Sequence, residues 1–197
     1  MTSSMLRVTF FELPNLPEPD EPPTQPVWAG PRDDEGGVVV PLNRLLARSE
    51  EVAVRLLSAT VFSTGFELAT AVRTSEPIEA LHESFGMHHR RRKSGELEPG
   101  FFRFGLEFAD GRKATNLGYP GSGFRGDPSQ PVLVPRGSGG GHRRWDGDWW
   151  VWPLPPAGPL SVVSEWPAYG IALTRQEFDA GTLLDAADRV EQLWPAR

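Results

Sequence analysis

The stretch Trp145-Asp146-Gly147-Asp148-Trp149-Trp150-Val151-Trp152 decides the fold, because it holds four of the seven tryptophans in a chain of 197 residues. An indole ring buries about 150–250 Å² of surface, so rings at this density form the centre of a core. The stretch leads through a proline-rich turn at 153–159 into an apolar segment at 160–166. The sequence therefore predicts a hairpin of two strands, 145–152 and 160–166.

The turn suggests a register for this hairpin. If Leu154 lies opposite Leu160, alternation sends one set of side chains to the core and the other to the reverse face. The core set is Trp150, Trp152, Leu154, Leu160, Val162 and Trp166. The reverse set brings Trp149 next to Glu165, and a ring beside a carboxylate can hold a sugar or a cationic group. A second layer packed over Trp149 is the alternative.

Other segments alternate with period two and predict further antiparallel strands. Turns at Ser63-Thr64-Gly65 and Asp110-Gly111 join the clearest pairs. In chain order the expected strands are 38–46, 52–62, 66–73, 102–108, 112–117, 131–135, 145–152 and 160–166.

Helical spacing occurs in two places. A short inserted helix is expected over 75–85, and an amphipathic C-terminal helix runs from Asp179 or Thr182 to Trp194. Together these elements predict an all-β fold with minor α content, an antiparallel β-sandwich or open barrel of about eight strands. We assign 36–197 to a single domain of this kind.

Residues 1–35 are interpreted as a proline-rich acidic extension. Proline fixes φ and lacks a backbone donor, so this segment should be extended and without a core of its own. Trp28 is its one strong anchor, and it predicts an arm that lies over the domain. An arm that binds a partner is the alternative.

The composition of the chain argues against several classes of protein. A net charge of −6 opposes general nucleic-acid binding, which depends on Lys and Arg at phosphates. The chain has no cysteine, no signal-peptide pattern and no apolar run of membrane-spanning length. We therefore expect a cytoplasmic protein without a membrane span.

No catalytic residue is assigned, but Asp146 and Asp148 are candidate binding residues that lie two positions apart on one face of a strand. Paired carboxylates at a suitable separation can perform acid and base chemistry on a glycosidic bond. Solvated acids at the end of a strand are the alternative. The four histidines show no zinc-ligand spacing, and the glycine-rich motifs do not complete a nucleotide loop, so no metal or cofactor is expected.

The strongest basic cluster is Arg90-Arg91-Arg92 with Lys93 and the preceding His88 and His89. Such a block can grip an acidic partner or phosphates. A solvated loop balanced by Glu96 and Glu98 is the alternative.

The sequence thus predicts a non-enzymatic binding or assembly module that engages another protein, because no complete catalytic constellation is present. A carbohydrate-binding or carbohydrate-active domain that uses Trp149, Glu165, Asp146 and Asp148 is the second hypothesis. Nucleic-acid binding would require the arginine block to meet other basic residues in space.

Overall fold

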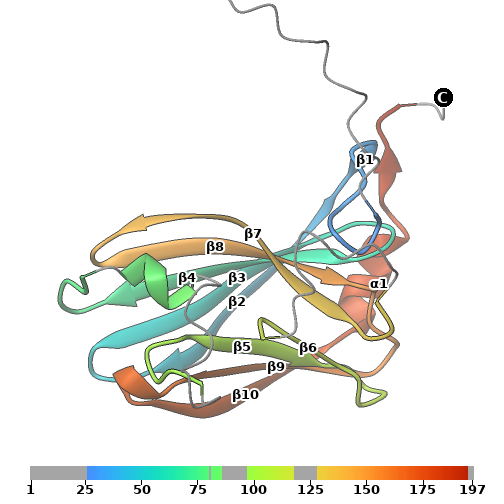
Figure 1. Ribbon diagram of the computed structural model, residues 1–197. Coiled ribbons are helices and arrows are strands. Elements are labelled where there is room, and N and C mark those ends of the chain that lie inside the picture. Colours follow the sequence, from blue (N-terminus) through green and yellow to red (C-terminus); the bar gives the residue numbers. More distant parts are fainter. Residues whose placement is uncertain (1–25, 80, 86–96, 118–127, 195–197) are drawn as a thin grey trace, which may run out of the picture.

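The computed structural model describes residues 26–79, 81–85, 97–117 and 128–194, and shows two antiparallel sheets packed face to face (Figure 1). One sheet has five strands in the order β2-β3-β4-β8-β7, and the other has four in the order β10-β9-β5-β6. The predicted all-β sandwich with minor α content is therefore confirmed.

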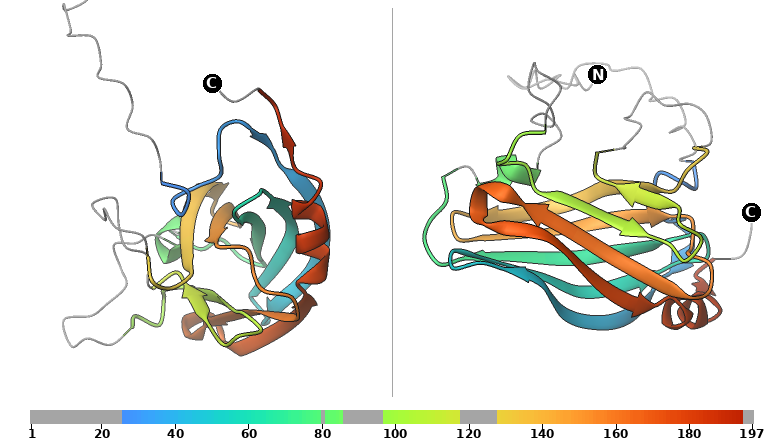
Figure 2. Two further views of the ribbon diagram at one scale, coloured as in Figure 1. Left: turned by 90° about the vertical axis from the view of Figure 1, so that its right-hand side faces the viewer. Right: turned by 90° about the horizontal axis from the view of Figure 1, so that it is seen from below.

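The five-stranded sheet consists of β2 (Val38–Arg48), β3 (Val52–Val61), β4 (Phe66–Thr74), β7 (Val132–Gly141) and β8 (Arg144–Trp152). The four-stranded sheet consists of β5 (Arg103–Glu107), β6 (Lys113–Thr115), β9 (Pro159–Trp166) and β10 (Ile171–Asp179). The short elements are β1 (Glu35–Gly36), β11 (Glu191–Gln192), the 3₁₀ helices η1 (Leu81–Phe85) and η3 (Pro167–Tyr169), and the helix α1 (Gly181–Ala187). Figure 2 shows α1 alongside β2 at one side of the sandwich.

The main core lies between the sheets and is rich in aromatic rings. Trp145 stacks on Phe85 with 3.8 Å between ring centroids, and Trp149 lies 5.3 Å from Phe104 across the two layers. The indole nitrogen of Trp149 donates to Thr70 Oγ1 over 3.0 Å, and the Thr70 hydroxyl donates to the carbonyl oxygen of Gly147 over 2.8 Å. These polar atoms are therefore satisfied inside the core, as buried polar groups require.

The prediction of a tryptophan hairpin is wrong. β8 pairs with β4 and β7, whereas β9 pairs with β5 and β10 in the other sheet. The segment between Trp152 and Pro159 crosses from one layer to the other, so the register built on Leu154 and Leu160 does not occur.

The hairpin partner of β8 is β7, which extends beyond the predicted strand 131–135 through a glycine-rich half. In the paired register Gly140 lies opposite Trp145, and Gly141 lies opposite Arg144. A Cβ atom at Gly140 would come within 2.1 Å of the Arg144 carbonyl oxygen, so the close approach of these two strands requires glycine there. The scarcity of side chains hides this part of the strand in the sequence, because it leaves no alternation of polar and apolar residues.

The observed pairing also exchanges the faces of β8. Trp145, Trp149 and Val151 point into the main core, whereas Trp150 belongs to a smaller cluster on the outer face of the five-stranded sheet. The prediction that Trp150 faces the main core and Trp149 the reverse side is therefore wrong.

Trp28 covers this outer cluster and so acts as an anchor, as the sequence predicts. The cluster contains Trp28, Phe62, Val132, Val134 and Trp150. The indole nitrogen of Trp150 donates to the backbone oxygen of Trp28 over 3.1 Å. The segment around Trp28 is thus packed on the sandwich, and Glu35–Gly36 pairs with Glu191–Gln192 as a small two-stranded sheet.

Two further differences concern the C-terminal region. Residues 171–179 form the edge strand β10, which the sequence analysis did not predict, and the helix that follows ends at Ala187. The chain then turns to form β11, so Trp194 is 65% exposed and is not part of a helical stripe.

The helix predicted at 75–85 is shorter in the structure, where only the 3₁₀ turn Leu81–Phe85 forms.

Candidate functional site

The outer face of the four-stranded sheet carries a hollow that we call the outer hollow. Arg175 of β10, Val163 of β9, Gly105 of β5 and Thr115 of β6 stand in register across it. Because Gly105 has no side chain, this row is low at its centre. A Cβ atom there would lie 2.8 Å from the Ala114 carbonyl oxygen, so the close strand pairing favours glycine.

The outer hollow encloses about 300 Å³, which is at the lower end of the volumes of ligand pockets, roughly 300–1,000 Å³. Its apolar walls include Leu173, which is 64% exposed, and Leu117, which is 37% exposed. Its lining is Leu97, Arg103, Gly105, Leu106, Glu107, Lys113, Thr115, Leu117, Val163, Ser164, Glu165, Leu173 and Arg175. The two exposed leucines give the recess an apolar edge.

Charged groups of both signs surround the hollow. Arg103 forms an ion pair with Glu165, and Glu107 contacts Arg175 at 2.9 Å and Lys113 at 3.6 Å. The hydrogen bond from Arg175, with the charges of Arg175 and Lys113, holds the pKa of Glu107 below its usual value. Glu107 is therefore ionised at neutral pH and faces two basic side chains.

Glu165 and Trp149 do not share a face, so the predicted pairing of these two residues is wrong. Trp149 is only 2% exposed and lies between the sheets, whereas Glu165 lies on the outer side of the four-stranded sheet. The physical reason is the crossover between β8 and β9, which puts the two residues in different layers. Trp149 cannot stack on a sugar in this arrangement.

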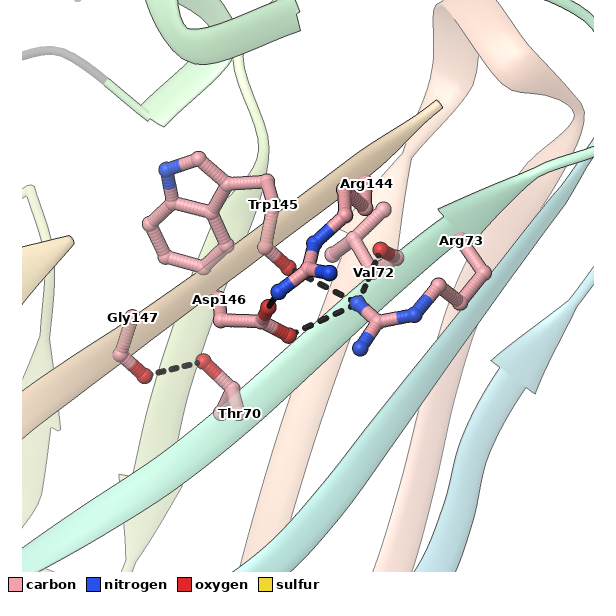
Figure 3. Close-up of polar contacts among 7 residues, drawn as sticks. All are labelled: Thr70, Val72, Arg73, Arg144, Trp145, Asp146 and Gly147. Atoms are coloured by element: carbon pink, nitrogen blue, oxygen red, sulfur yellow. Dashed lines mark hydrogen bonds and ion pairs between the residues drawn. The ribbon is translucent and has the colours of Figure 1, made fainter. Parts of the chain in front are cut away.

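Asp146 and Asp148 lie on the outer face of the other sheet. Figure 3 shows the Asp146 carboxylate between two guanidinium groups, which contact it at 2.7 Å from Arg73 and 3.0 Å from Arg144. Arg73 also donates to the carbonyl oxygens of Val72 and Trp145. Asp146 therefore ties β4 to β8 on the sheet surface.

Asp148 lies near a second carboxylate, Glu67. Partial desolvation and then the charge of Asp146 raise the pKa of Asp148. Desolvation also raises the pKa of Glu67, with a further rise from Asp148 and an opposing effect of Arg136, whose Nε lies 3.6 Å from the carboxylate. This arrangement is a set of crowded acids on an open face, outside the outer hollow.

The raised pKa of Glu67 predicts a pH effect. A carboxyl with a folded pKa above its unfolded value of about 4.5 binds its proton more tightly in the folded state, so folding stability falls as pH rises through that interval. Glu67→Gln should therefore be more stable than the wild type near pH 7, and this advantage should vanish near pH 4. Urea unfolding from pH 4 to pH 8 measures it.

The exposed residue Glu50 supplies the control for this measurement. Glu50→Gln removes the same charge at the turn between β2 and β3 and should change the pH profile little. A Glu67→Gln protein that is less stable than the wild type at neutral pH would show that the ion pair with Arg136 outweighs the desolvation.

Arg90, Arg91 and Arg92 lie outside the described residues. Within the described part of the chain, no group of three or more His, Asp or Glu side chains could hold a metal ion. No described helix has both the length and the apolar character needed to cross a membrane.

The chain matches no protein-family model, and no curated protein or solved structure is significantly similar to it. Its function must therefore be inferred from the chemistry of its own surfaces.

Sequence reasoning found one residue of the outer hollow, Glu165, and missed the apolar ones. Leu173 lies on the unpredicted strand β10, and Leu117 lies beyond the end of β6. The sequence did mark the position of Gly105, since it stands between Arg103 and Glu107 on the polar face of the predicted strand 102–108. A missing side chain in the middle of a polar row indicates a hollow only when the neighbouring strands are known.

Proposed function

We propose that this chain is a non-enzymatic binding module that engages another protein through the outer hollow. The observation that carries the proposal is an apolar recess over Gly105 and Val163, flanked by the exposed side chains of Leu173 and Leu117. Filling it with an apolar side chain of a partner would remove these leucines from water, at about 25 cal/mol for each Å² buried.

The lining favours an aliphatic or aromatic side chain of a protein over a sugar. Carbohydrate sites usually offer an aromatic ring for stacking, and none of the described residues that line the recess is aromatic. The carbohydrate hypothesis also loses Trp149, which is buried in the core.

The rim favours a partner with polar groups of both signs. Arg103 with Glu165, and Glu107 with Arg175 and Lys113, offer donors and acceptors around an apolar centre. This is the usual anatomy of a protein interface, an apolar centre inside a polar rim. A phosphate-rich ligand would meet two carboxylates here as well as three cations.

We further propose a cytoplasmic location, which the absence of cysteine supports.

Leu173→Glu tests the proposal. The substitution puts an uncompensated carboxylate against the apolar part of the contact, and burying an unpaired charge is costly. We expect binding of the native partner to weaken at least about tenfold, which corresponds to about 1.4 kcal/mol. Immobilised wild-type and variant proteins are incubated with an extract of the cells that make the protein, and the recovered proteins are compared by quantitative mass spectrometry.

Val39→Glu is the matched control, because Val39 is equally exposed at 64% but lies on β2 of the other sheet. A partner should be recovered by the wild type and by this control and lost with Leu173→Glu, and the purified partner should then give the same order in titrations. Equal binding of all three proteins by every recovered partner would reject the outer hollow as the contact surface.

A further inference from the structure

A second cavity opens between the two sheets, and we call it the edge cleft. It lies where the edge strands β2 and β10 face each other next to α1, and it encloses about 290 Å³. Its lining is Val40, Pro41, Leu42, Arg44, Leu56, Leu68, Leu160, Val162, Glu177, Phe178, Asp179, Thr182 and Leu183. The edge cleft is thus separate from the outer hollow and is open to a small molecule.

The inner wall of the edge cleft is formed by the main core. Leu56 and Leu68 come from one sheet, Leu160 and Val162 from the other, and Leu183 from α1. All five are buried aliphatic side chains. This aliphatic inner wall favours a hydrocarbon group over water, whereas the polar residues of the cleft lie nearer its entrance.

A bulge in β2 shapes the entrance. The pairing of β2 with β3 shifts register between Pro41 and Arg44, and Asn43 between them has a φ of 48°. A non-glycine residue in the left-handed region is uncommon, and proline cannot donate a backbone hydrogen bond. The bulge bends the edge of the sheet at the entrance, and such bulges often re-aim a side chain.

The side chain that follows the bulge is Arg44. It pairs in register with Leu56, a buried core residue, and side chains directly opposite each other in an antiparallel pair lie on the same face. Arg44 therefore belongs to the side of β2 that faces the other sheet, and it lines the edge cleft. Its side chain is exposed at this position, so the guanidinium group is available at the entrance.

Two acidic residues of β10 also reach the edge cleft, but their positions differ from that of Arg44. Asp179 Oδ1 accepts the backbone N–H of Gly181 over 2.9 Å, which turns this carboxylate toward the start of α1. Glu177 is opposite Ser161, whereas Phe178 and Gln176 are opposite the core residues Leu160 and Val162. Successive side chains of a strand point to opposite faces, so alternation from these neighbours directs Glu177 away from the aliphatic wall.

From this arrangement we propose that the edge cleft binds a small amphipathic anion, a carboxylate attached to a short hydrocarbon chain. The hydrocarbon chain enters the cleft and lies against its aliphatic wall, beside Leu160 and Leu183. The carboxylate lies at the entrance and accepts hydrogen bonds from the planar guanidinium group of Arg44, which matches a carboxylate in geometry.

Three probes of equal chain length separate the contribution of the head group from that of the chain. Hexanoate, hexan-1-ol and hexylamine are titrated into the full-length protein at pH 7 and constant ionic strength, and binding is followed by methyl and amide NMR shifts. We expect hexanoate to bind best and hexylamine worst, with the largest shifts at leucines and valines of the edge cleft. Stronger binding of hexylamine would overturn the proposal and assign the entrance to Glu177 and Asp179.

Charge substitution at Arg44 tests the role of the guanidinium group. Arg44→Gln should weaken the binding of hexanoate about two- to fivefold, the upper part of the range for a solvent-exposed ion pair, and leave the binding of hexan-1-ol unchanged. Arg44→Glu should reverse the order, so that hexylamine binds better than hexanoate. The side chain is exposed, so both variants should fold.

Arg55→Glu is the matched control, since Arg55 is an exposed arginine on the neighbouring strand β3 and lies outside the lining of the edge cleft. It changes the net charge equally and should keep the wild-type order of the three probes. The proposal fails if the control and Arg44→Glu change the order alike, or if the NMR shifts map to residues outside the edge cleft.

Discussion

Trp149→Ala is expected to lower the free energy of unfolding by about 3–5 kcal/mol, the range for removal of a large ring from a core. The ring is 2% exposed and packs against Phe104 of the opposite sheet and against Trp145 on its own strand. Its removal leaves a cavity at the contact between the two layers. The Thr70 hydroxyl keeps its hydrogen bond to the Gly147 carbonyl oxygen, so the loss comes mainly from packing.

Urea unfolding followed by circular dichroism measures this loss. Trp194→Ala is the control, because its ring is 65% exposed and its removal should change stability little. If the two variants lost the same small amount of stability, the indole of Trp149 would have to lie outside the core, and an exposed ring at this position would become a candidate for binding again.

The density of tryptophan did predict the centre of the fold, but not which strands meet there. The alternation of polar and apolar residues predicts which side chains share a face of a strand, but it does not predict which face packs against the other sheet. In 145–152 both faces carry indole rings, so Trp149 and Trp150 fitted either side equally well. The neighbours of the strand decide the matter, since Phe104 and Phe85 cover one face and Trp28 covers the other.

Pairing was predicted correctly where a short turn connects two alternating segments. β3 with β4 and β5 with β6 follow the predicted turns at 63–65 and 110–111. The predicted pairing of β8 with the segment 160–166 is wrong, because the segment 153–158 resembles a turn but carries the chain from one sheet to the other. Local sequence cannot distinguish a hairpin from such a crossover, since both need a short polar or proline-rich connection.

The candidate sites could be predicted only in part for the same reason. Glu165 was recognised as a charged group on a strand, but its neighbours in the outer hollow come from other strands. Arg44 of the edge cleft gave no signal in the sequence, because its position depends on the bulge at Asn43. Both sites arise from the pairing of distant segments and from backbone irregularity, which composition and spacing do not encode.

Trp28→Ala is expected to lower the free energy of unfolding by about 3 kcal/mol, even though residue 28 precedes the predicted domain boundary at 35. The ring is buried against the outer face of the five-stranded sheet, and its backbone oxygen accepts the indole N–H of Trp150. With the ring removed, Trp150 and Phe62 become exposed to water on that face. The loss is therefore a property of the sandwich and not of a detachable arm.

Val27→Ala is the control for this prediction, since the neighbouring valine is exposed and should contribute little. Both variants are unfolded in urea, and an aqueous quencher of tryptophan fluorescence reports the summed exposure of their indole rings, to which Trp194 contributes equally in both. Higher quenching in Trp28→Ala together with the loss of stability would place the true start of the domain before Trp28. Unchanged stability and unchanged quenching would restore the boundary at residue 35 and make residues 26–34 an arm that can leave the sheet.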